Sequence, residues 1–313
     1  MMNHLNKVTV FAPATSANVA VGFDILGFAI ADLGDEVTVE KSSTQGLKIV
    51  SILGREPIPY DVAKNTASVA IQSMLDYLNL KQGFHLSIKK NIPLSSGLGG
   101  SAATSVAALV ALNRFIKAPL SRGQLAEFAM DGEQVACGAK HGDNVIPCLF
   151  GGMTLIHSLS PIGLVQLPLM PMYIVLLHPH LHLETRESRG VLQKNISLSS
   201  YVKQSAHLAS LISALYEKNY ERLASSCVDE LIEPMRAHLI PYFYGIKDAA
   251  YKSGALACSI SGSGPTLFAL AKTKKIAQLI ADNMGLILKH NEIQYDVIIT
   301  TISLKGAEVI DER

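Results

Sequence analysis

The chain has 313 residues, 49% hydrophobic and 17% charged, so it can bury a substantial core and divide into two lobes. Its formal net charge is +1, it lacks tryptophan, and no basic run is interleaved with aromatic residues. These features exclude electrostatic recruitment of nucleic acid or of an anionic membrane. No apolar run approaches the roughly 18 residues of a membrane span. Four polar residues interrupt the apolar stretch near the N-terminus, so we expect no signal peptide and a cytoplasmic protein.

The cysteines and histidines show no metal-binding pattern. The four cysteines (Cys137, Cys148, Cys227 and Cys258) form no C-x-x-C pair, so we expect buried free thiols in a reducing compartment. No glutamate or cysteine completes a metal site around the histidines, and we assign no role to His141, His178, His180 and His182.

Helix and strand patterns mix along the chain without a regular alternation, which favours an α+β fold over a doubly wound sheet. The first strands alternate in polarity and are rich in valine and threonine, whereas the most apolar helix is apolar almost all round and should be deeply buried. In the first half we predict strands at residues 7–12, 36–41 and 85–89, helices at residues 66–78, 101–116 and 125–137, and a loop followed by a strand at residues 145–156. In the second half we predict a strand at residues 172–178, paired helices at residues 199–224, a strand, loop and further element at residues 255–271, and a strand at residues 295–303.

A glycine-rich loop, Gly97-Leu98-Gly99-Gly100-Ser101-Ala102, precedes the most apolar of these helices. It fits the loose dinucleotide-binding fingerprint, but six residues separate it from the preceding strand, and no carboxylate ends a second strand about 20 positions later. No Gly-Lys-Ser/Thr follows, so it is not a Walker-type loop either. The loop is still suited to phosphate, because its glycines allow close backbone approach and a helix N-terminus begins at Ser101. A tight turn that only permits close helix packing is the alternative.

Two further stretches place polar residues in apolar surroundings. One is a second glycine-rich turn, Ser261-Gly262-Ser263-Gly264-Pro265-Thr266, inside an apolar segment. The other carries Asn18 and Asp24 in the stretch that begins Pro13-Ala14-Thr15-Ser16. Burying an asparagine or aspartate without a partner costs several kcal/mol. Each must therefore be satisfied internally or completed by a polar ligand.

Together these motifs resemble the three signatures of the GHMP small-molecule kinases. The stretches "PATSANVAVGFDILGFAI", "GDNVIPCLFGGM", "EPMRAHLIPYF" and "ISGSGPTLFAL" are most similar to the members that phosphorylate L-homoserine. The resemblance runs from about Val8 to Leu270, and four ordered, separated motifs make it specific.

The resemblance implies a two-lobe α+β fold with the active site in the cleft between an N-terminal ATP-binding lobe, residues 1–160, and a C-terminal lobe, residues 161–313. The implied reaction transfers the γ-phosphoryl group of ATP, with Mg²⁺, to the side-chain hydroxyl of L-homoserine, giving O-phospho-L-homoserine in threonine biosynthesis. The expected partners are therefore ATP and L-homoserine, with a homodimer possible and neither nucleic acid nor membrane involved.

The resemblance also implies roles for individual residues. Ser101 and Glu133 match the Mg²⁺ ligands, and Asn65 matches a residue near the nucleotide base. Arg189 and Arg236 match the cations for the substrate carboxylate, where an arginine binds in a bidentate fashion that lysine does not match. Asp24 matches the anion for the ammonium group. For Arg186 and Arg189, a solvated charged turn at the surface is the alternative interpretation. The implied ATP-binding residues are Asn65, Pro93, Leu94, Ser95, Ser96, Gly97, Leu98, Gly99, Gly100, Ser101, Ala102, Ala103 and Thr104. The implied substrate-binding residues are Asn18, Asp24, Asn144, Thr185, Arg189, Arg236 and Gly262, and the implied catalytic residues are Asn144, Ser101 and Glu133.

One position departs from the family pattern. The loop usually reads Gly-Leu-Gly-Ser-Ser, whereas this chain has Gly100 at the first serine, so one phosphate-facing hydroxyl is missing and weaker ATP binding is expected. Phosphoryl transfer depends mainly on positioning and charge neutralisation, so a strong general base is not essential. We predict that Asn144 faces the acceptor hydroxyl and that Asp143 is structural.

Two other functions remain as alternatives. A related kinase for mevalonate or another small alcohol would keep the ATP loop but would not need Asp24 for an ammonium group. A non-catalytic nucleotide or amino-acid sensor on the same scaffold would explain Gly100. The presence of Ser101, Glu133 and the second glycine-rich turn argues against a sensor.

Overall fold

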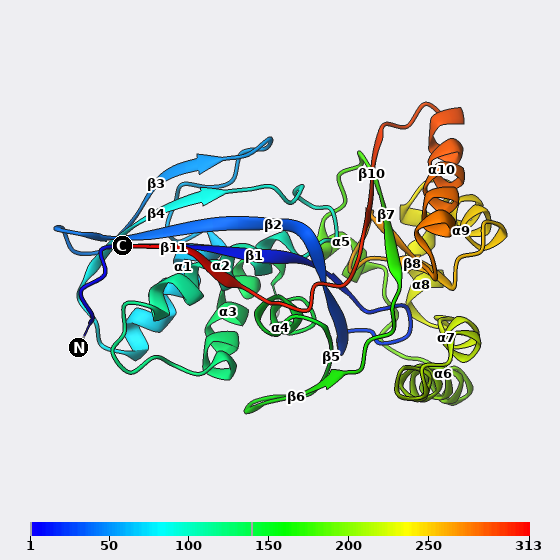
Figure 1. The fold of residues 1–313 in the computed structure, drawn as a ribbon, viewed down its shortest axis with the longest axis horizontal. Coiled ribbons are helices and arrows are strands. Elements are labelled where there is room, and N and C mark those ends of the chain that lie inside the picture. The colour runs from blue at the N-terminus through cyan, green and yellow to red at the C-terminus, as the bar shows by residue number, and fades with distance from the viewer. Residues whose placement is uncertain (1, 139) are drawn as a thin grey trace.

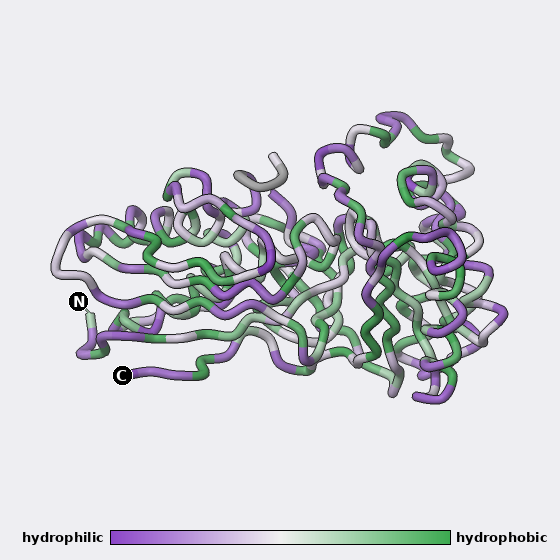
Figure 2. The backbone as a smooth tube through the Cα atoms, turned by 90° about the horizontal axis from the view of Figure 1, so that it is seen from above, coloured by the Kyte–Doolittle hydropathy of each residue, from purple (hydrophilic) through white to green (hydrophobic). Residues whose placement is uncertain are grey.

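The computed structural model describes residues 2–138 and 140–313, apart from the side chains of residues 135–137, and shows two lobes side by side (Figure 1). Each lobe is built on its own sheet, with most of its helices on one side. The hydrophobic stretches, green in Figure 2, follow the strands through both lobes, and the outer loops are mostly hydrophilic. The mixed arrangement confirms the predicted α+β class.

The first lobe holds a seven-stranded sheet. Its main path runs β11-β1-β2-β4-β3, and β5 pairs with the far end of β2 and with β6. The alternation that predicts β1 and β2 from sequence also shows in their burial, since Val8, Val10, Val37 and Val39 are fully buried. The strands are β1 (Lys7–Ala17), β2 (Leu26–Ser42), β3 (Leu47–Leu53), β4 (Gly83–Lys89), β5 (Met153–Leu159), β6 (Ile162–Leu167) and β11 (Glu308–Glu312).

Four helices cover this sheet. The central one, α2 (Gly100–Asn113), packs against β1 and β2 and against the three other helices. Its small side chains allow this close packing, and ten of its residues are buried. The others are α1 (Thr66–Tyr77), α3 (Arg122–Cys137) and α4 (Val145–Phe150).

The second lobe holds a four-stranded antiparallel sheet in the order β10-β7-β9-β8. The amphipathic helices α9 (Phe243–Lys252) and α10 (Lys274–His290) pack beside it and bury a second hydrophobic core. The strands are β7 (Tyr173–Pro179), β8 (Ala257–Ile260), β9 (Leu267–Ala271) and β10 (Tyr295–Thr300). The remaining helices are α5 (Thr185–Gly190), α6 (Leu198–Glu217), α7 (Tyr220–Ser226) and α8 (Ile232–Arg236), with a 3₁₀ turn at Ala237–Leu239.

Strand pairing divides the chain differently from a single break at residue 160. That position falls inside the β5–β6 hairpin, and β6 belongs to the first sheet. The chain also returns to the first lobe at its end, where β11 pairs with β1. A shift in composition does not reveal such a return, because pairing between segments distant in sequence leaves no local signal.

Most predicted elements are present, with one correction. The residues after Asn144 form the short helix α4 and not a loop. Pro147 is compatible with this helix, because it lies in the first turn, where a missing N–H is tolerated. Cys148, Cys227 and Cys258 are buried free thiols as expected, whereas the side chain of Cys137 lies outside the described residues. Among the described residues, no helix is long and apolar enough to cross a membrane.

Candidate active site

A cleft of about 520 Å³ opens between the two lobes and collects almost all of the residues singled out in the sequence. Its walls come from the turn after β1, the loop before α2, the N-termini of α1 and α4, and the helices α5 and α8. Two predicted residues do not reach it: Ala102 and Ala103 are fully buried in α2 and pack in the core. The predicted residues that line it are Asn18, Asp24, Asn65, Pro93, Leu94, Ser95, Ser96, Gly97, Leu98, Gly99, Gly100, Ser101, Thr104, Glu133, Asn144, Thr185, Arg189, Arg236 and Gly262.

The loop between β4 and α2 ends at a helix N-terminus with no side-chain cap. Gly99 is left-handed, with φ of 66°, and a Cβ there would lie 2.0 Å from Thr15 Oγ1. Only glycine fits at this position, because it needs both the positive φ and the close approach. The first N–H groups of α2 therefore remain available at the positive end of the helix dipole, an arrangement that binds phosphate.

The second glycine-rich turn supports this loop from the other lobe. Ser261 Oγ donates to Gly97 O at 2.8 Å, and Thr266 N donates to Ser96 O at 3.2 Å. A Cβ on Gly97 would lie 2.3 Å from Ser261 O, so the two turns pack backbone against backbone. This contact explains Gly97, and a Cβ on Gly262 of the second turn would lie 3.0 Å from Gly97 O. The second turn therefore supports the backbone of the loop before α2.

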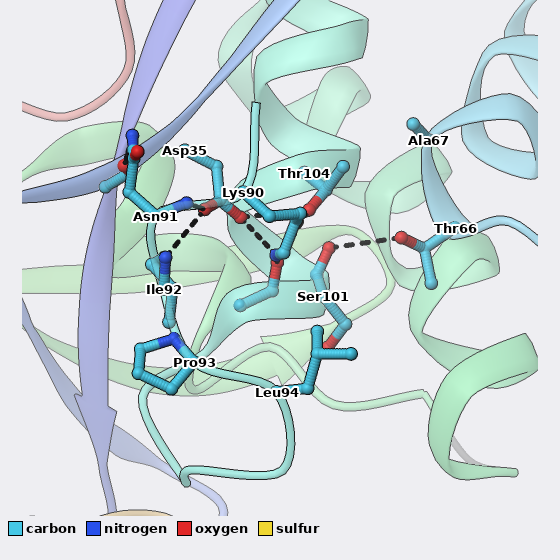
Figure 3. Close-up of polar contacts among 12 residues, drawn as sticks. Asp35, Thr66, Ala67, Lys90, Asn91, Ile92, Pro93, Leu94, Ser101 and Thr104 are labelled. Atoms are coloured by element: carbon cyan, nitrogen blue, oxygen red, sulfur yellow. Dashed lines mark hydrogen bonds and ion pairs between the residues drawn. The ribbon is translucent and has the colours of Figure 1, made fainter. Parts of the chain in front are cut away.

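A buried ion pair anchors the start of the same loop (Figure 3). Lys90 Nζ pairs with Asp35 and donates to Gly100 O at 2.8 Å and to Thr104 Oγ1 at 3.0 Å. Asp35 Oδ1 accepts the backbone N–H groups of Asn91 and Ile92 at 2.9 and 3.0 Å. The hydroxyl of Thr104 therefore takes part in a buried network, and Lys90 is a cation at the cleft wall that the sequence analysis missed.

Ser101 and Glu133 meet beside the helix N-terminus. Burial raises the pKa of Glu133 to about 7, while a hydrogen bond from Ser101 and the charge of Lys90 oppose that rise. A buried carboxylate next to a hydroxyl offers two hard oxygen ligands, the type that Mg²⁺ prefers. No group of three or more histidine, cysteine, aspartate or glutamate residues that could hold a metal occurs among the described residues.

The opposite end of the cleft carries opposite charges. Arg189 Nη2 donates to Asp24 Oδ1 at 2.5 Å, so these two predicted substrate ligands pair with each other. Arg236 is buried and donates to Ser188 O and Gly262 O, both at 3.0 Å. Burial and the charge of Arg189 lower the pKa of Arg236 to about 10, so it stays charged at neutral pH. Both guanidinium groups lie near the ring of Phe23, with Arg189 Cζ 5.4 Å and Arg236 Cζ 5.3 Å from its centroid.

The cleft is also lined by His141, Asp143 and Asn144. Asn144 Oδ1 accepts from Thr15 Oγ1 at 2.8 Å, which orients the amide. Burial and the charge of Asp24 raise the pKa of Asp143 to about 7. His141 Nδ1 lies 3.9 Å from Asp24 Oδ2, and burial together with Arg189 lowers the pKa of its imidazole. Asp143 Oδ1, His141 Nε2 and Arg189 Nε are buried without a hydrogen-bond partner among the described residues.

Asn65 lines the cleft, but both polar atoms of its side chain are engaged in hydrogen bonds within the fold. Its Oδ1 accepts from Ala67 N at 3.1 Å and caps α1, and its Nδ2 donates to Pro59 O at 3.0 Å. Ile58, Pro59 and Lys64 complete this wall. Asn65 therefore holds the segment that lines this part of the cleft.

The cleft is also lined by Phe23, Lys90 and His141, for which the sequence predicts no role. Phe23 adjoins Asp24 and Lys90 ends the strand before the loop, so their positions in the sequence are the only available signal. His141 stands three residues before Asn144, yet a single histidine carries no pattern that separates it from a structural residue.

Models of the GHMP kinase family match both halves of the chain: the N-terminal domain model matches residues 65–152 and the C-terminal model matches residues 211–288. A homoserine kinase of Chlorobium phaeobacteroides is 41% identical and covers 98% of this chain and 100% of its own. A homoserine kinase of Xylella fastidiosa is 40% identical and covers 97% of this chain and 94% of its own.

Solved structures show the same relationship. The crystal structure of homoserine kinase from Cytophaga hutchinsonii superposes with a TM-score of 0.94 at 41% identity and covers 99% of both chains. The L. major mevalonate kinase in complex with R-mevalonate has a TM-score of 0.72 at 17% identity over 96% of both chains, which shows that the fold is shared.

Proposed function

This chain belongs to the homoserine kinases of the GHMP kinase family, and we propose that the cleft described above is where it carries out the reaction of that family. There it transfers the γ-phosphoryl group of ATP to the side-chain hydroxyl of L-homoserine and yields O-phospho-L-homoserine. The observation that carries this assignment is that one cleft joins a phosphate-binding loop to a pair of opposite charges. A sugar or mevalonate carries no ammonium group and would offer Asp24 no cation in place of Arg189.

The phosphate end suits MgATP. The loop from Pro93 to Gly99 and the N-terminus of α2 supply backbone N–H groups for the triphosphate. Glu133 and Ser101 would hold Mg²⁺, since this ion typically takes one or two protein oxygens together with phosphate oxygens and water. A bound Mg²⁺ would neutralise charge on the β- and γ-phosphates and restore the ionised form of Glu133.

The amino-acid end suits a zwitterion. In the chain alone, Asp24 and Arg189 neutralise each other at 2.5 Å. L-Homoserine can replace both halves of this contact, with its ammonium group on Asp24 and its carboxylate between Arg189 and Arg236. Arg236 is held by two backbone carbonyls, so its position is set before the substrate binds.

Between these ends the chain orients the acceptor hydroxyl. Thr15 fixes the amide of Asn144, which we place at the hydroxyl, whereas Asp143 shapes the buried wall. The acceptor oxygen bonds to the γ-phosphorus as the bond from that phosphorus to the β–γ bridging oxygen breaks, so ADP leaves with the bridging oxygen. The hydroxyl proton passes to an oxygen of the transferred phosphoryl group and from there to solvent, and a strong base is not needed because the transition state is loose. If Asp143→Asn abolished turnover while homoserine binding stayed intact, and Asn144→Ala was nearly silent, these two roles would have to be exchanged.

The first test measures ADP release with MgATP and a panel of L-homoserine, L-serine, mevalonate and no acceptor. We expect turnover that requires L-homoserine, with L-serine reduced by roughly 10- to 200-fold, because one methylene contributes about 1–3 kcal/mol of discrimination. Turnover with mevalonate would favour a kinase for another alcohol. ATP binding without turnover on any acceptor would favour a non-catalytic sensor.

A further inference from the structure

The turn that presents Asp24 has an unusual backbone. Asn18, Val19 and Ala20 have φ of 72°, 46° and 61°, three consecutive residues other than glycine in the left-handed region. For the β-branched Val19 this conformation is strained, and such strain persists only where the surroundings impose it. Buried apolar packing of Val19 and Ala20 supplies part of that constraint.

Gln204 on α6 holds the same turn from outside the cleft. Its Nε2 donates to Val21 O at 3.0 Å and to Asp229 Oδ1 at 3.1 Å, and its Oε1 accepts from Glu230 N at 2.9 Å. The two amide hydrogens and the oxygen thus all have partners, and a flipped amide would lose them. Gln204 is not among the residues that line the cleft.

Asp229 extends this contact to the helix that carries Arg236. Its carboxylate accepts the N–H groups at the start of α8, from Leu231, Ile232 and Glu233, at 2.8 to 3.0 Å. At the other end of α8, Arg236 donates to Gly262 O at 3.0 Å, and Asn18 Nδ2 donates to that same oxygen at 2.8 Å.

These bonds close a ring around the amino-acid end of the cleft. The ring runs from Asn18 through Gly262 to Arg236, along α8 to Asp229, and through Gln204 back to the turn at Val21. α6 also follows α5, which carries Arg189, after a connection of seven residues. The amide of Gln204 therefore joins the turn that bears Asp24 to the helix that bears Arg236.

We propose that Gln204 is a positioning residue for the amino-acid substrate: it sets the distance between the turn of Asp24 and the helix of Arg236 without touching the ligand. This inference rests on the proposed function, because it takes L-homoserine as the ligand of that end. The phosphate-binding loop shares none of the bonds that Gln204 makes. Loss of the amide should therefore affect homoserine and spare ATP.

The test compares Gln204→Leu and Gln204→Glu with the wild type in steady-state kinetics. Leucine has a similar size to glutamine but removes all three hydrogen bonds. Glutamate replaces the donating amide nitrogen with an oxygen acceptor, which then faces Val21 O and the Asp229 carboxylate. We expect the KM for L-homoserine to rise about tenfold in the leucine variant and more in the glutamate variant, with the KM for MgATP within about twofold of wild type.

Gln278→Leu is the matched control, because Gln278 is an exposed glutamine whose Nε2 donates to Asp282 Oδ1 at 2.9 Å on α10. It should leave both KM values unchanged. Equal rises in the two KM values, or kinetics like those of Gln278→Leu, would overturn the positioning role. If a Gln204 variant is too unstable for kinetics, the dissociation constant of L-homoserine is measured for the other variant under folded conditions. A wild type that neither binds nor phosphorylates L-homoserine would instead contradict the proposed function.

Discussion

Gly100 illustrates how much a single position depends on its buried neighbours. A Cβ at Gly100 would lie 3.2 Å from Lys90 Nζ and 3.3 Å from Ile92 Cγ2, both tighter than ordinary contact. The space that a serine would use in the related loops is thus bordered by the Lys90 ammonium group. We infer that Gly100 accommodates Lys90, whose positive charge at the cleft wall offsets the missing hydroxyl.

Gly100→Ser should therefore weaken ATP binding although it restores the usual loop sequence. We expect a two- to fivefold higher KM for MgATP and a loss of about 1 kcal/mol in the free energy of unfolding, since overpacking displaces the Lys90 network. Kinetics and urea unfolding measure the two effects. Gly123→Ser is the control, because its Cβ would meet only Ser121 Oγ at 3.9 Å. Tighter ATP binding in Gly100→Ser would show that the absent hydroxyl limits affinity.

Asp143 gives a second prediction at the scale of one residue, about pH. Burial raises the pKa of its carboxyl from 3.8 to about 7 in the folded chain. The folded state therefore binds a proton that the unfolded state releases, and this stabilisation is lost as the pH rises from about 4 through 7. Asp143→Asn removes the titration, so the stability of the variant relative to wild type should increase over that range.

The expected gain of Asp143→Asn is on the order of 4 kcal/mol between pH 4 and pH 8, because each pKa unit corresponds to about 1.4 kcal/mol. Urea unfolding of the substrate-free chain at several pH values measures it. Asp282→Asn, at an exposed position of α10, controls for a general effect of losing a carboxylate. A difference from wild type that stays constant with pH would mean that Asp143 is not buried as a neutral acid.

At the scale of elements, the pair of Asp35 and Lys90 connects β2, the end of β4 and the start of α2. Both side chains are nearly fully buried, and Asp35 also accepts two backbone N–H groups of the loop between β4 and α2. A buried ion pair adds little net stability compared with apolar residues, but removal of one partner leaves an uncompensated charge.

Lys90→Met should thus lower the free energy of unfolding by about 3–5 kcal/mol and weaken MgATP binding through a misplaced loop. Lys89→Met is a close control, because Lys89 is the neighbouring residue of β4 and its surface pair with Glu36, at 2.8 Å, should contribute less than about 1 kcal/mol. Chemical unfolding and ATP titration measure both variants. Comparable stability of the two would show that the buried pair does not anchor the loop.

Local patterns in the sequence predict elements, and they do so best where the pattern is long and periodic. The helix α3 and the strands β1, β2 and β4 contain their predicted segments, whereas α1 and α2 end one and three residues before the predicted ends at residues 78 and 116. The sequence does not predict the short α5 and α8, because five or six residues carry too little periodicity. It does not predict β3, β6 and β11 either, because the pairing of these strands is set by distant segments. The strongly amphipathic α10 does carry a helical stripe of apolar residues in its sequence, although no helix is predicted there above.

The candidate site likewise has a part that the sequence predicts and a part that it does not. The glycine-rich loop, Asp24 and Arg236 follow from motifs, because their residue types carry the chemistry directly. What the sequence does not reveal is how these residues hold one another: the contact between the two glycine-rich turns, the pairing of Asp24 with Arg189, and the amide of Gln204 all join segments more than 160 residues apart.

At the scale of the whole molecule, the two lobes are linked by more than the cleft. Phe28 of the first sheet packs edge-on against Phe268 of the second, with ring centres 5.9 Å apart. Asn18 and Ser16 are bonded to Gly262 and Ser261 across the lobes. The chain then crosses back after β10, and β11 closes the first sheet at β1 near the N-terminus (Figure 1). We therefore expect the lobes to unfold together.

Removal of residues 306–313 tests this coupling. The truncation deletes β11 and the buried Ala307, and it exposes β1 as a free edge, although it removes no residue of the cleft. We expect a single unfolding transition at a lower urea concentration. The free energy of unfolding should fall by about 3 kcal/mol, because four strand pairings and the buried contact of Ala307 are lost. Because β1 leads directly into the turn of Asn18 and Asp24, affinity for L-homoserine should fall as well.

Glu312→Ala keeps the strand and loses only the exposed pair with Arg114, so it should remain within about 1 kcal/mol of wild type. Two separate transitions, with only the first one shifted, would show that the lobes fold independently and that the returning strand stabilises one of them alone.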